Sequence, residues 1–372
     1  MIDKLKTKNN KNIIFYIIVA FCFVSSIFFV YNNHQFYQRP IAKVIETSVT
    51  ETTETEDLYG NKDKLFIQEI IAEIKNGEEK GQQILLDNEY SSSGAYDFEY
   101  KSGNELFIYI DKDNTTLTGN ITDVKRDKYI VIAMWIFIFA LLLVGKRQGL
   151  FATISLAINM LLLSWALDIY VNTGLNLLWI FGVTVVLFTV SSLLLVNGRN
   201  EKTYAAIITT ILGTFISLLI TYLAIWFTSG KGLYYEEMSF LTRPYQLVFL
   251  AGLFVGSLGA VMDVAISMSS ALYELYQRDH HISNDSLKKS GLNIGKDIMG
   301  TMTNILFFAY ISGSIPILIV YFKNASPLGY ALSLNLSLEI ARALSGGIGI
   351  VLTIPIGIYT TILFINRKRA KL

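Results

Sequence analysis

The 372-residue sequence contains a single cysteine, Cys22, and only 16% charged residues. One cysteine excludes an intramolecular disulfide and any metal cluster built from cysteines. A soluble domain usually carries about a quarter charged residues, so the charge deficit argues against a conventional soluble fold. The formal net charge of +1 gives no electrostatic footprint for nucleic acid. What the chain does have is 52% hydrophobic residues, arranged in long runs that indicate an integral membrane protein.

Eight apolar runs are long enough to cross a bilayer as helices. A hydrocarbon core about 30 Å thick requires about 20 apolar residues in an α-helix, whereas a transmembrane β-barrel would show shorter, alternating segments. The predicted spans are 13–31, 129–145, 150–171, 174–196, 203–228, 246–276, 298–322 and 344–365. The sequence therefore predicts an α-helical polytopic membrane protein of about eight transmembrane helices.

The positions of lysine and arginine predict the orientation. With the N-terminus inside, sixteen of these residues lie on the cytoplasmic side, whereas Lys231, Arg243 and Lys323 lie in short outer loops. Positive residues favour the cytoplasmic side, so both termini are expected in the cytoplasm. The first span has no small-x-small cleavage site after it and is expected to be an uncleaved anchor. The expected plan is a cytoplasmic tail at 1–12, an anchor at 13–31, an outer domain at 32–128, a seven-helix membrane domain at 129–365 and a basic cytoplasmic tail at 366–372.

The outer region is acidic and contains no apolar run of membrane length. Strand-like stretches, separated by turn residues, are expected at 41–50, 64–75, 82–88, 105–111 and 117–125. About five short strands in under a hundred residues predict a small extracytoplasmic β-barrel, with an OB-like barrel as the leading interpretation.

The sixth span carries small and polar residues along one helical face. They recur at steps of three or four residues: Gly252, Gly256, Gly259, Asp263, Ser267, Ser270 and Glu274. The glycines are expected to let a neighbouring helix approach closely. A carboxylate near mid-membrane costs about 2.5 to 3.5 kcal/mol on insertion scales, so Asp263 is expected to face protein or water. Asp263 is therefore the leading functional candidate, whereas Glu274 is equally compatible with an interfacial residue that reaches water.

A second polar face opens the seventh span. Asp297, Thr301 and Asn304 occupy positions i, i+4 and i+7 of the expected helix. Two interpretations of Asp297 are open, a site residue or a carboxylate in the first turn of the helix. The threonines are equally able to bond back to their own backbone carbonyls. Pro316 is expected to kink this helix, because it lacks a backbone donor.

Before the last span, Glu339 and Arg342 precede the glycine-rich run 346–349. We expect a short surface or re-entrant helix here, then a break, and then the final span with Pro355. Glu339 and Arg342 are spaced i, i+3 and can pair with each other. If the segment dips inward, Arg342 instead becomes a counter-charge for Asp263. Broken helices that line polar cavities are common in transporters, although glycine breaks also occur in inert bundles.

Three common enzyme motifs are missing from the sequence. It contains no Gly-x-Ser-x-Gly elbow, no His-Glu-x-x-His pattern and no Walker-type loop, so we expect no enzyme of these classes and no cofactor. His280 and His281 are adjacent in a polar loop without a regularly spaced third ligand, and they are more typical of solvated side chains than of a metal site.

Three segments carry a resemblance to a known family. They are the stretch from Gly256 to Leu275 around Asp263, the stretch from Gly295 to Asn304, and Glu339-Ile-Ala-Arg342 with the glycines and Pro355 that follow. The chain resembles the YibE/F-like bacterial multi-spanning proteins over nearly its whole length. The resemblance implies a protein of the bacterial cytoplasmic membrane and supplies no reaction.

The leading hypothesis is a permease or transporter for an unknown small solute or ion. Its path would be lined by Asp263, Ser267, Ser270, Glu274, Asp297, Thr301, Asn304, Glu339 and Arg342. The alternative is a non-catalytic membrane scaffold or assembly factor, whose outer domain binds a protein partner and whose intramembrane polar groups only hold helices together. A third hypothesis is an intramembrane enzyme that acts on a lipid-linked substrate with paired carboxylates.

The orientation is directly testable. Cysteines introduced at Ser92 and Ser326 should react with an impermeant thiol reagent added outside intact cells, whereas a cysteine at Ser286 should not, because the positive residues keep its loop inside. Labelling of position 286 from outside would overturn the eight-span topology.

Overall fold

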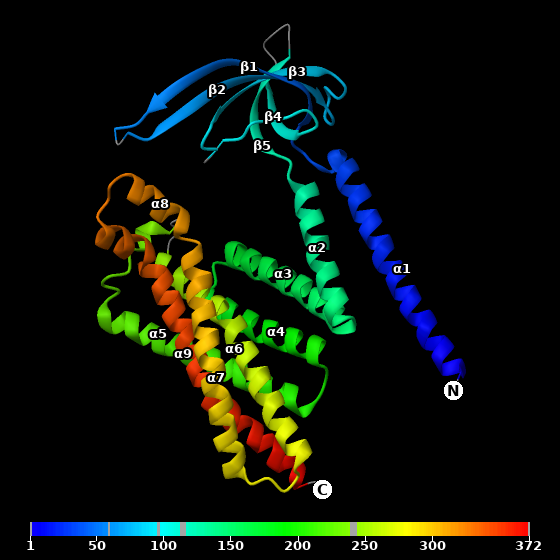
Figure 1. Cartoon of the computed structure of the whole chain (residues 1–372), viewed down its shortest axis with the longest axis vertical. Helices are drawn as coiled ribbons and strands as arrows, with labels where there is room; N and C mark the ends of the chain where they lie inside the picture. The colour runs from blue at the N-terminus through cyan, green and yellow to red at the C-terminus, as the bar shows by residue number, and fades with distance from the viewer. Residues whose placement is uncertain (1, 59, 95–96, 112–116, 239–243, 371–372) are drawn as a thin grey trace. The chain divides into compact units, whose positions relative to one another are not determined.

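The computed structural model describes the chain except for residues 1, 59, 95–96, 112–116, 239–243 and 371–372 (Figure 1). Arg243, one of the three cations assigned to outer loops, lies outside the described residues. The chain divides into two compact units, Met1–Ala140 and Leu141–Leu372. The first contains a small sheet between two helices, and the second is helical.

The first unit begins with helix α1 (Ile2–Asn32) and ends within helix α2 (Asp127–Gly145). Between them lie a short 3-10 turn, Asn33–Phe36, and five strands: β1 (Ile41–Glu56), β2 (Lys62–Ile74), β3 (Gln83–Ser91), β4 (Glu105–Asp111) and β5 (Thr118–Val124). The prediction of a small five-stranded sheet is confirmed. The hairpin of β1 and β2 is longer than expected, because its pairing continues to Glu56 opposite Lys62.

The strands follow the order β1-β2-β3-β5-β4. β1 pairs antiparallel with both β2 and β4, whereas β3 and β5 run parallel. Alternate residues point inward, as a period of two requires: Ile70, Ala72 and Ile74 of β2 are buried, while Ile71 between them is exposed. They pack with Leu86 and residues of β4 into one apolar core.

A buried ion network lies where this sheet meets its two helices. Lys125, at the end of β5, is only 1% exposed and lies 3.1 Å from Glu105 and 3.0 Å from Asp127. Its ammonium also donates to the Val30 carbonyl of α1 at 3.0 Å. His34 Nε2 lies 3.1 Å from the Glu105 carboxylate. All three polar bonds of the ammonium are therefore made within the unit, which fixes the ends of α1 and α2 against the sheet.

The pKa shifts of this network favour its charged form. Burial would raise the pKa of Glu105, but His34 and Lys125 outweigh it and hold that pKa below its usual value. This contribution to stability is present above the unfolded-state pKa of Glu105 and is lost as pH falls through the folded-state pKa. Burial would lower the pKa of Lys125, but Asp127 and Glu105 raise it overall. Its contribution is present below the unfolded-state pKa and is lost as pH rises through the folded-state pKa, so Glu105 and Lys125 are both charged at neutral pH.

The second unit consists of helices: α3 (Arg147–Thr173), α4 (Leu177–Asn197), α5 (Glu201–Thr228), α6 (Tyr245–Arg278), α7 (Asn284–Ser312), α8 (Ile315–Lys323) and α9 (Leu328–Arg369). Within the described residues of the whole chain, seven helices are long and apolar enough to cross a membrane. α7 and α8 pass the same test together and meet at a 52° bend. The prediction of a multi-pass helical protein is confirmed, and the bend lies at Gly313–Ser314, just before Pro316.

The expected break before the last span is wrong. α9 is one continuous helix of 42 residues that runs through the glycine-rich run and Pro355. At 1.5 Å per residue it is about 63 Å long, roughly twice the thickness of a hydrocarbon core. Its glycines do not end the helix because neighbouring helices pack directly on them.

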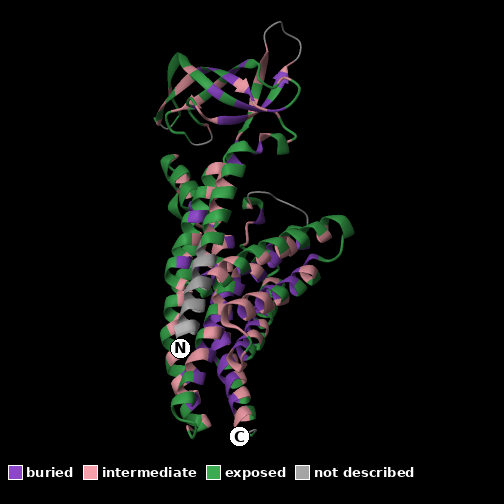
Figure 2. Cartoon of the chain, turned by 90° about the vertical axis from the view of Figure 1, so that its right-hand side faces the viewer, coloured by how far each residue is buried: buried purple, intermediate pink, exposed green. Residues whose placement is uncertain are grey.

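Glycine and hydroxyl residues join α5 to α9. A Cβ at Gly213 of α5 would clash with the Thr353 hydroxyl, and one at Gly349 of α9 would lie 3.3 Å from the Ser217 hydroxyl. Ser217 donates to the Ser345 carbonyl at 2.7 Å, and the Thr209 and Thr360 hydroxyls lie 2.6 Å apart. We call this contact the small-residue seam. Apolar side chains of α6, α7 and α9 form the core beside it, and Figure 2 shows buried residues along the packed helices of this unit.

The buried ion network yields a prediction for stability. Lys125→Met keeps the apolar stem but leaves Glu105 and Asp127 without their cation, which should cost about 3 to 5 kcal/mol. In purified full-length protein, hydrogen exchange at the β4 amides should then quicken by at least about a hundredfold, since each 1.4 kcal/mol is tenfold. Lys64→Met is the control, because Lys64 pairs with Glu54 at an exposed position. Equal exchange in both variants would contradict a structural role for the network.

Candidate functional site

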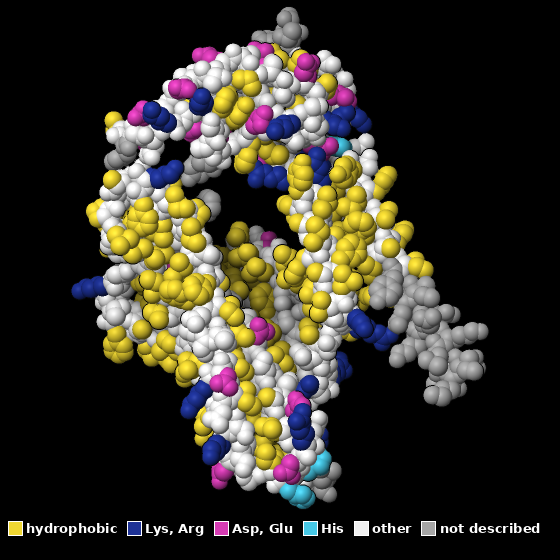
Figure 3. All heavy atoms as spheres, in the orientation of Figure 1, with side chains coloured by type: hydrophobic (Ala, Val, Ile, Leu, Met, Phe, Trp, Pro, Cys, Tyr) yellow, Lys and Arg dark blue, Asp and Glu magenta, His cyan; other side chains and the backbone are white. Residues whose placement is uncertain are grey.

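The polar face predicted for the sixth span lies on α6, and much of it is uncovered. Asp263 and Ser267 are exposed, Ser270 is half-buried, and Glu274 is exposed and pairs with Arg278 at 2.6 Å. Asp263 lies near the middle of the 34-residue helix. Figure 3 shows acidic side chains among hydrophobic ones on the surface of this unit.

Only one of the three α6 glycines has the expected role. A Cβ at Gly256 would clash with the hydroxyl of Tyr310 on α7, so this glycine does admit a neighbouring helix. Gly252 and Gly259 have open space where a Cβ would lie. The expectation of close helix packing is therefore wrong for these two positions, because no neighbouring described residue lies within 4 Å of where their Cβ would be.

The predicted residues of the seventh span share an exposed face of α7. Asp297, Thr301 and Asn304 are all exposed. The interpretation of Asp297 as a residue of the first helical turn is wrong, since α7 begins at Asn284 and Ser283 caps it by accepting from the Ser286 amide. The Thr301 hydroxyl bonds back to the Ile298 carbonyl at 2.9 Å, which is the alternative considered for these threonines.

Glu339 and Arg342 are half-buried and bonded to each other on α9. The Arg342 guanidinium also lies over the ring of Phe249 on α6, 5.3 Å from its centroid. Arg342 is therefore paired with Glu339, three residues earlier on the same helix, rather than with Asp263.

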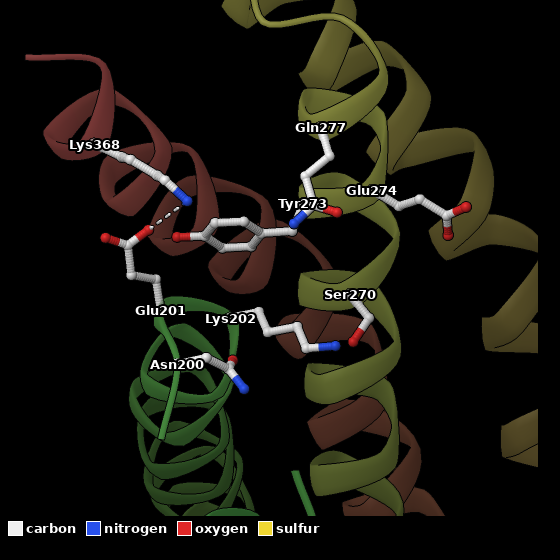
Figure 4. Close-up of a pocket in the computed structure, with 8 residues that line it drawn as sticks. All are labelled: Asn200, Glu201, Lys202, Ser270, Tyr273, Glu274, Gln277 and Lys368. Atoms are coloured by element: carbon white, nitrogen blue, oxygen red, sulfur yellow. Dashed lines mark ion pairs between the residues drawn. The ribbon is translucent and has the colours of Figure 1, made fainter. Parts of the chain in front are cut away.

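The structure gathers a different set of polar residues around a cavity of about 650 Å³. The cavity lies where the start of α5, the end of α6 and the end of α9 meet (Figure 4). Its lining is Asn200, Glu201, Lys202, Ser270, Tyr273, Glu274, Gln277 and Lys368. Two of the predicted site residues, Ser270 and Glu274, are among them. We call this space the α5–α6–α9 cavity.

The charged side chains that line the cavity form one long ion pair. Lys368 Nζ lies 3.7 Å from Glu201 Oε2, an ion pair too long for a hydrogen bond. In Figure 4 the Tyr273 hydroxyl points toward the Glu201 carboxylate, Lys202 extends toward Ser270, and the Glu274 carboxylate points away from the others. The Tyr273 hydroxyl and Glu201 Oε2 are both shielded from solvent, and the hydroxyl is placed to donate to the Glu201 carboxylate.

Sequence reasoning missed Glu201, Lys202, Tyr273 and Lys368 as members of one site. Three separate segments supply them, so no spacing in the sequence brings them together. The only local signal is Asn200, which caps α5 by accepting from the Thr203 amide at 2.9 Å and so marks a helix start beside two charged residues.

A metal site receives no support from the described part of the chain. No group of three or more His, Cys, Asp and Glu side chains there is placed to hold an ion. His280 packs edge-on against the ring of Tyr276, with 5.0 Å between the ring centroids.

Comparison with protein families gives two matches. Residues 133–367 match the YibE/F-like protein family, and residues 35–124 match the YibE/F family N-terminal domain. Together the matches span the helical unit and the sheet. Comparison with curated proteins and with solved structures gives no match.

Proposed function

The chain belongs to the YibE/F-like family, and we propose that it is a membrane permease for a small solute or ion. The observation that carries the proposal is the continuity of the α6 polar face with the α5–α6–α9 cavity. Glu274 and Ser270 line the cavity, and Ser267 and Asp263 continue the same face toward the middle of the helix. Asp263 lies eleven positions before Glu274 on the helix, which is about 16 Å along the helix axis.

The free-energy cost of exposing the Asp263 carboxylate to lipid supports a hydrated path along this face. Asp263 is exposed near the middle of an apolar helix, where contact with lipid would cost an ionised carboxylate several kcal/mol. Water or another polar surface must therefore lie against it. In this proposal Asp263 binds a cation or proton, and Ser267 and Ser270 supply neutral oxygens between it and the cavity. Asp297, Thr301 and Asn304 of α7 are further candidates, because their face is also exposed.

The proposal also covers the orientation of the protein in the membrane and the fold of its outer sheet. The protein would lie in a bacterial cytoplasmic membrane with both termini inside and residues 32–128 outside, as the cation distribution predicts. The cavity, near Lys202 and Lys368, would then open to the cytoplasm. For the outer sheet we propose an OB-like barrel, since β1 pairs with both β2 and β4 while β3 and β5 run parallel.

The second candidate function is a scaffold or assembly factor. It is favoured by the outer unit, whose sheet is large enough to bind a protein partner, and by the pairing of Arg342 with Glu339, which removes one cation from the expected path. A scaffold predicts tolerance of changes at Asp263 and a co-purifying partner. A permease predicts water at Ser267 and an essential carboxylate.

Water along α6 can be tested without knowing the solute. In a Cys22→Ser background, Ser267→Cys should react with an impermeant, water-soluble thiol reagent in inside-out vesicles, because a thiol reacts as its hydrated thiolate. Ile208→Cys is the control. Ile208 is 40% exposed on α5, and its neighbour Thr209 faces Gly357 together with Met268, the neighbour of Ser267, which places positions 208 and 267 at a similar depth. A lipid-facing thiol at this depth should stay unreacted. Equal protection of the two cysteines would exclude a hydrated path.

The role of the charge at Asp263 needs a second test. Asp263→Asn preserves shape, so the protein should remain at normal abundance in the membrane while complementation of a deletion strain fails. If the residue only locks helices, asparagine can still form an interhelical bond, typically worth about 0.6 kcal/mol, and complementation should survive. Ser267→Ala is the control on the same face and should have the smaller effect. Full complementation by Asp263→Asn at normal abundance would favour the scaffold.

A further inference from the structure

The first strand of the outer sheet has one edge that no described strand covers. β1 pairs with β2 as far as Glu56, whereas its pairing with β4 ends at Lys43. Val44 is the last bonded residue of this second edge, through the turn that precedes β4. From Glu46 to Glu56 no backbone hydrogen bond joins the edge to any described residue, and the hairpin extends past the other strands (Figure 1). We call this stretch the free edge of β1. A free edge is a template for a further strand, and proteins usually keep such edges short or covered.

The residues of the free edge favour an extended and accessible backbone. Their sequence is Glu-Thr-Ser-Val-Thr-Glu-Thr-Thr-Glu-Thr-Glu, with five threonines and one valine, which have high strand propensity. The stretch contains no proline and no lysine, two residues that commonly block an edge. All of it is exposed except Thr47 and Thr55, which are half-buried. The free edge is therefore already in the conformation that strand addition requires.

Two glutamates of the free edge are neutralised within the hairpin. Glu54 lies opposite Lys64 of β2 and pairs with it at 2.9 Å, and Glu56 lies opposite Lys62, 4.0 Å from its ammonium. These two pairs lie on the same face of the sheet as the buried residues of β2, because side chains alternate between the faces with a period of two.

The other two glutamates lie on the outward face without a cation. Glu46 lies opposite Ile71 and Glu51 lies opposite Ile67, and both isoleucines alternate with buried residues of β2. Neither glutamate forms an ion pair with any described residue. Ile71 is 38% exposed and Ile67 is 40% exposed, so apolar surface lies beside both carboxylates.

The third strand adds to the negative charge of this outward face. Asp87 of β3 lies directly opposite Glu69 of β2, and Glu89 lies opposite Ile67. None of these three carboxylates forms an ion pair with a described residue. Like charges directly opposite each other destabilise a sheet. A cation placed on the outward face would relieve that repulsion as well as pair with the glutamates of the free edge.

Charge decides which kind of strand fits the free edge. A second copy does not, since the stretch from Glu46 to Glu56 contains no cation and two such edges would bring glutamates together. Anionic lipid and nucleic acid are repelled for the same reason. We propose that the free edge of β1 binds an extended segment of another protein, which adds as a strand and places lysine or arginine against Glu46 and Glu51. Because Ile71 and Ile67, opposite these glutamates, are four residues apart, the segment carries its two cations at i and i+4.

The inference concerns the outer unit alone and does not rest on the permease proposal. Neither Asp263 nor the α5–α6–α9 cavity enters it. Failure of peptide binding would leave the thiol labelling of position 267 unaffected, and failure of that labelling would leave peptide binding unaffected.

The test uses full-length protein in nanodiscs and a fluorescent eight-residue peptide. The peptide alternates valine with threonine or lysine, and its two lysines are four residues apart, so both lie on one face of a strand. Its anisotropy should rise and saturate, and hydrogen exchange at the amides of residues 46–53 should slow by at least about tenfold at saturation. Three control peptides should bind more weakly. One has its lysines three residues apart and hence on opposite faces, one has glutamate in place of lysine, and one is N-methylated and cannot donate to a strand.

Charge-matched variants show whether the outward glutamates take part. Glu46→Gln combined with Glu51→Gln should weaken binding of the peptide by about fivefold, the range of two exposed ion pairs. Glu99→Gln combined with Asp123→Asn removes the same charge at exposed positions outside β1 and should bind normally. Equal affinity for both lysine spacings, or equal weakening in the two double variants, would overturn the proposal. Binding without slower exchange at residues 46–53 would overturn it too. If those amides are instead protected as the concentration of protein alone rises, a second copy occupies the edge and the proposal is wrong.

Discussion

The arrangement of the helical unit depends on the small-residue seam between α5 and α9. Apolar side chains gain little by leaving lipid for another helix, so close approach of backbones and hydrogen bonds between hydroxyls must hold such helices together. Gly213 and Gly349 allow that approach, and Ser217 and Thr209 bond across it. The hydroxyls that do not cross the seam bond to carbonyls of their own helix, as Thr353 does to Gly349 at 2.7 Å. Each of these hydroxyl groups is therefore bonded along the contact.

The seam also explains where the cavity forms. It extends along α5 at least from Thr209 to Thr221, whereas the cavity lies at the start of α5, in the first turn of the helix. Here the side chains become large and charged, and glycine no longer brings the backbones together. At the end of α9, Lys368 faces the cavity, while Arg369 reaches Asn284 at 3.0 Å and lies over the Tyr276 ring. Close packing along the seam and its loss at the charged end thus place three helix ends around one cavity lined by polar side chains.

Sequence patterns predicted the elements far better than the contacts between them. Hydrophobic runs and period-two alternation identified the membrane helices and all five strands, because both signals are local. The continuity of α9 could not be predicted, since the glycines that signal a break locally are retained for packing, as the contact of Gly349 with Ser217 shows. The cavity was missed for the same reason. Lys368 and Glu201 are far apart in the sequence, and only the fold brings them within 3.7 Å.

A contrast between two lysines separates structural charge from functional charge. Lys125 is as deeply buried as any lysine in the described chain, yet Glu105, Asp127 and the Val30 carbonyl satisfy every bond that it can donate. Such a network stabilises a junction and has nothing left to offer a ligand. Lys202 is only half-buried, yet it makes no ion pair with any described residue. Burial alone would select Lys125 as the functional candidate. Unsatisfied bonding capacity selects Lys202 instead, and by the same criterion Asp263, unlike the paired Glu339 and Arg342, is a charge of the helical unit that makes no ion pair with any described residue.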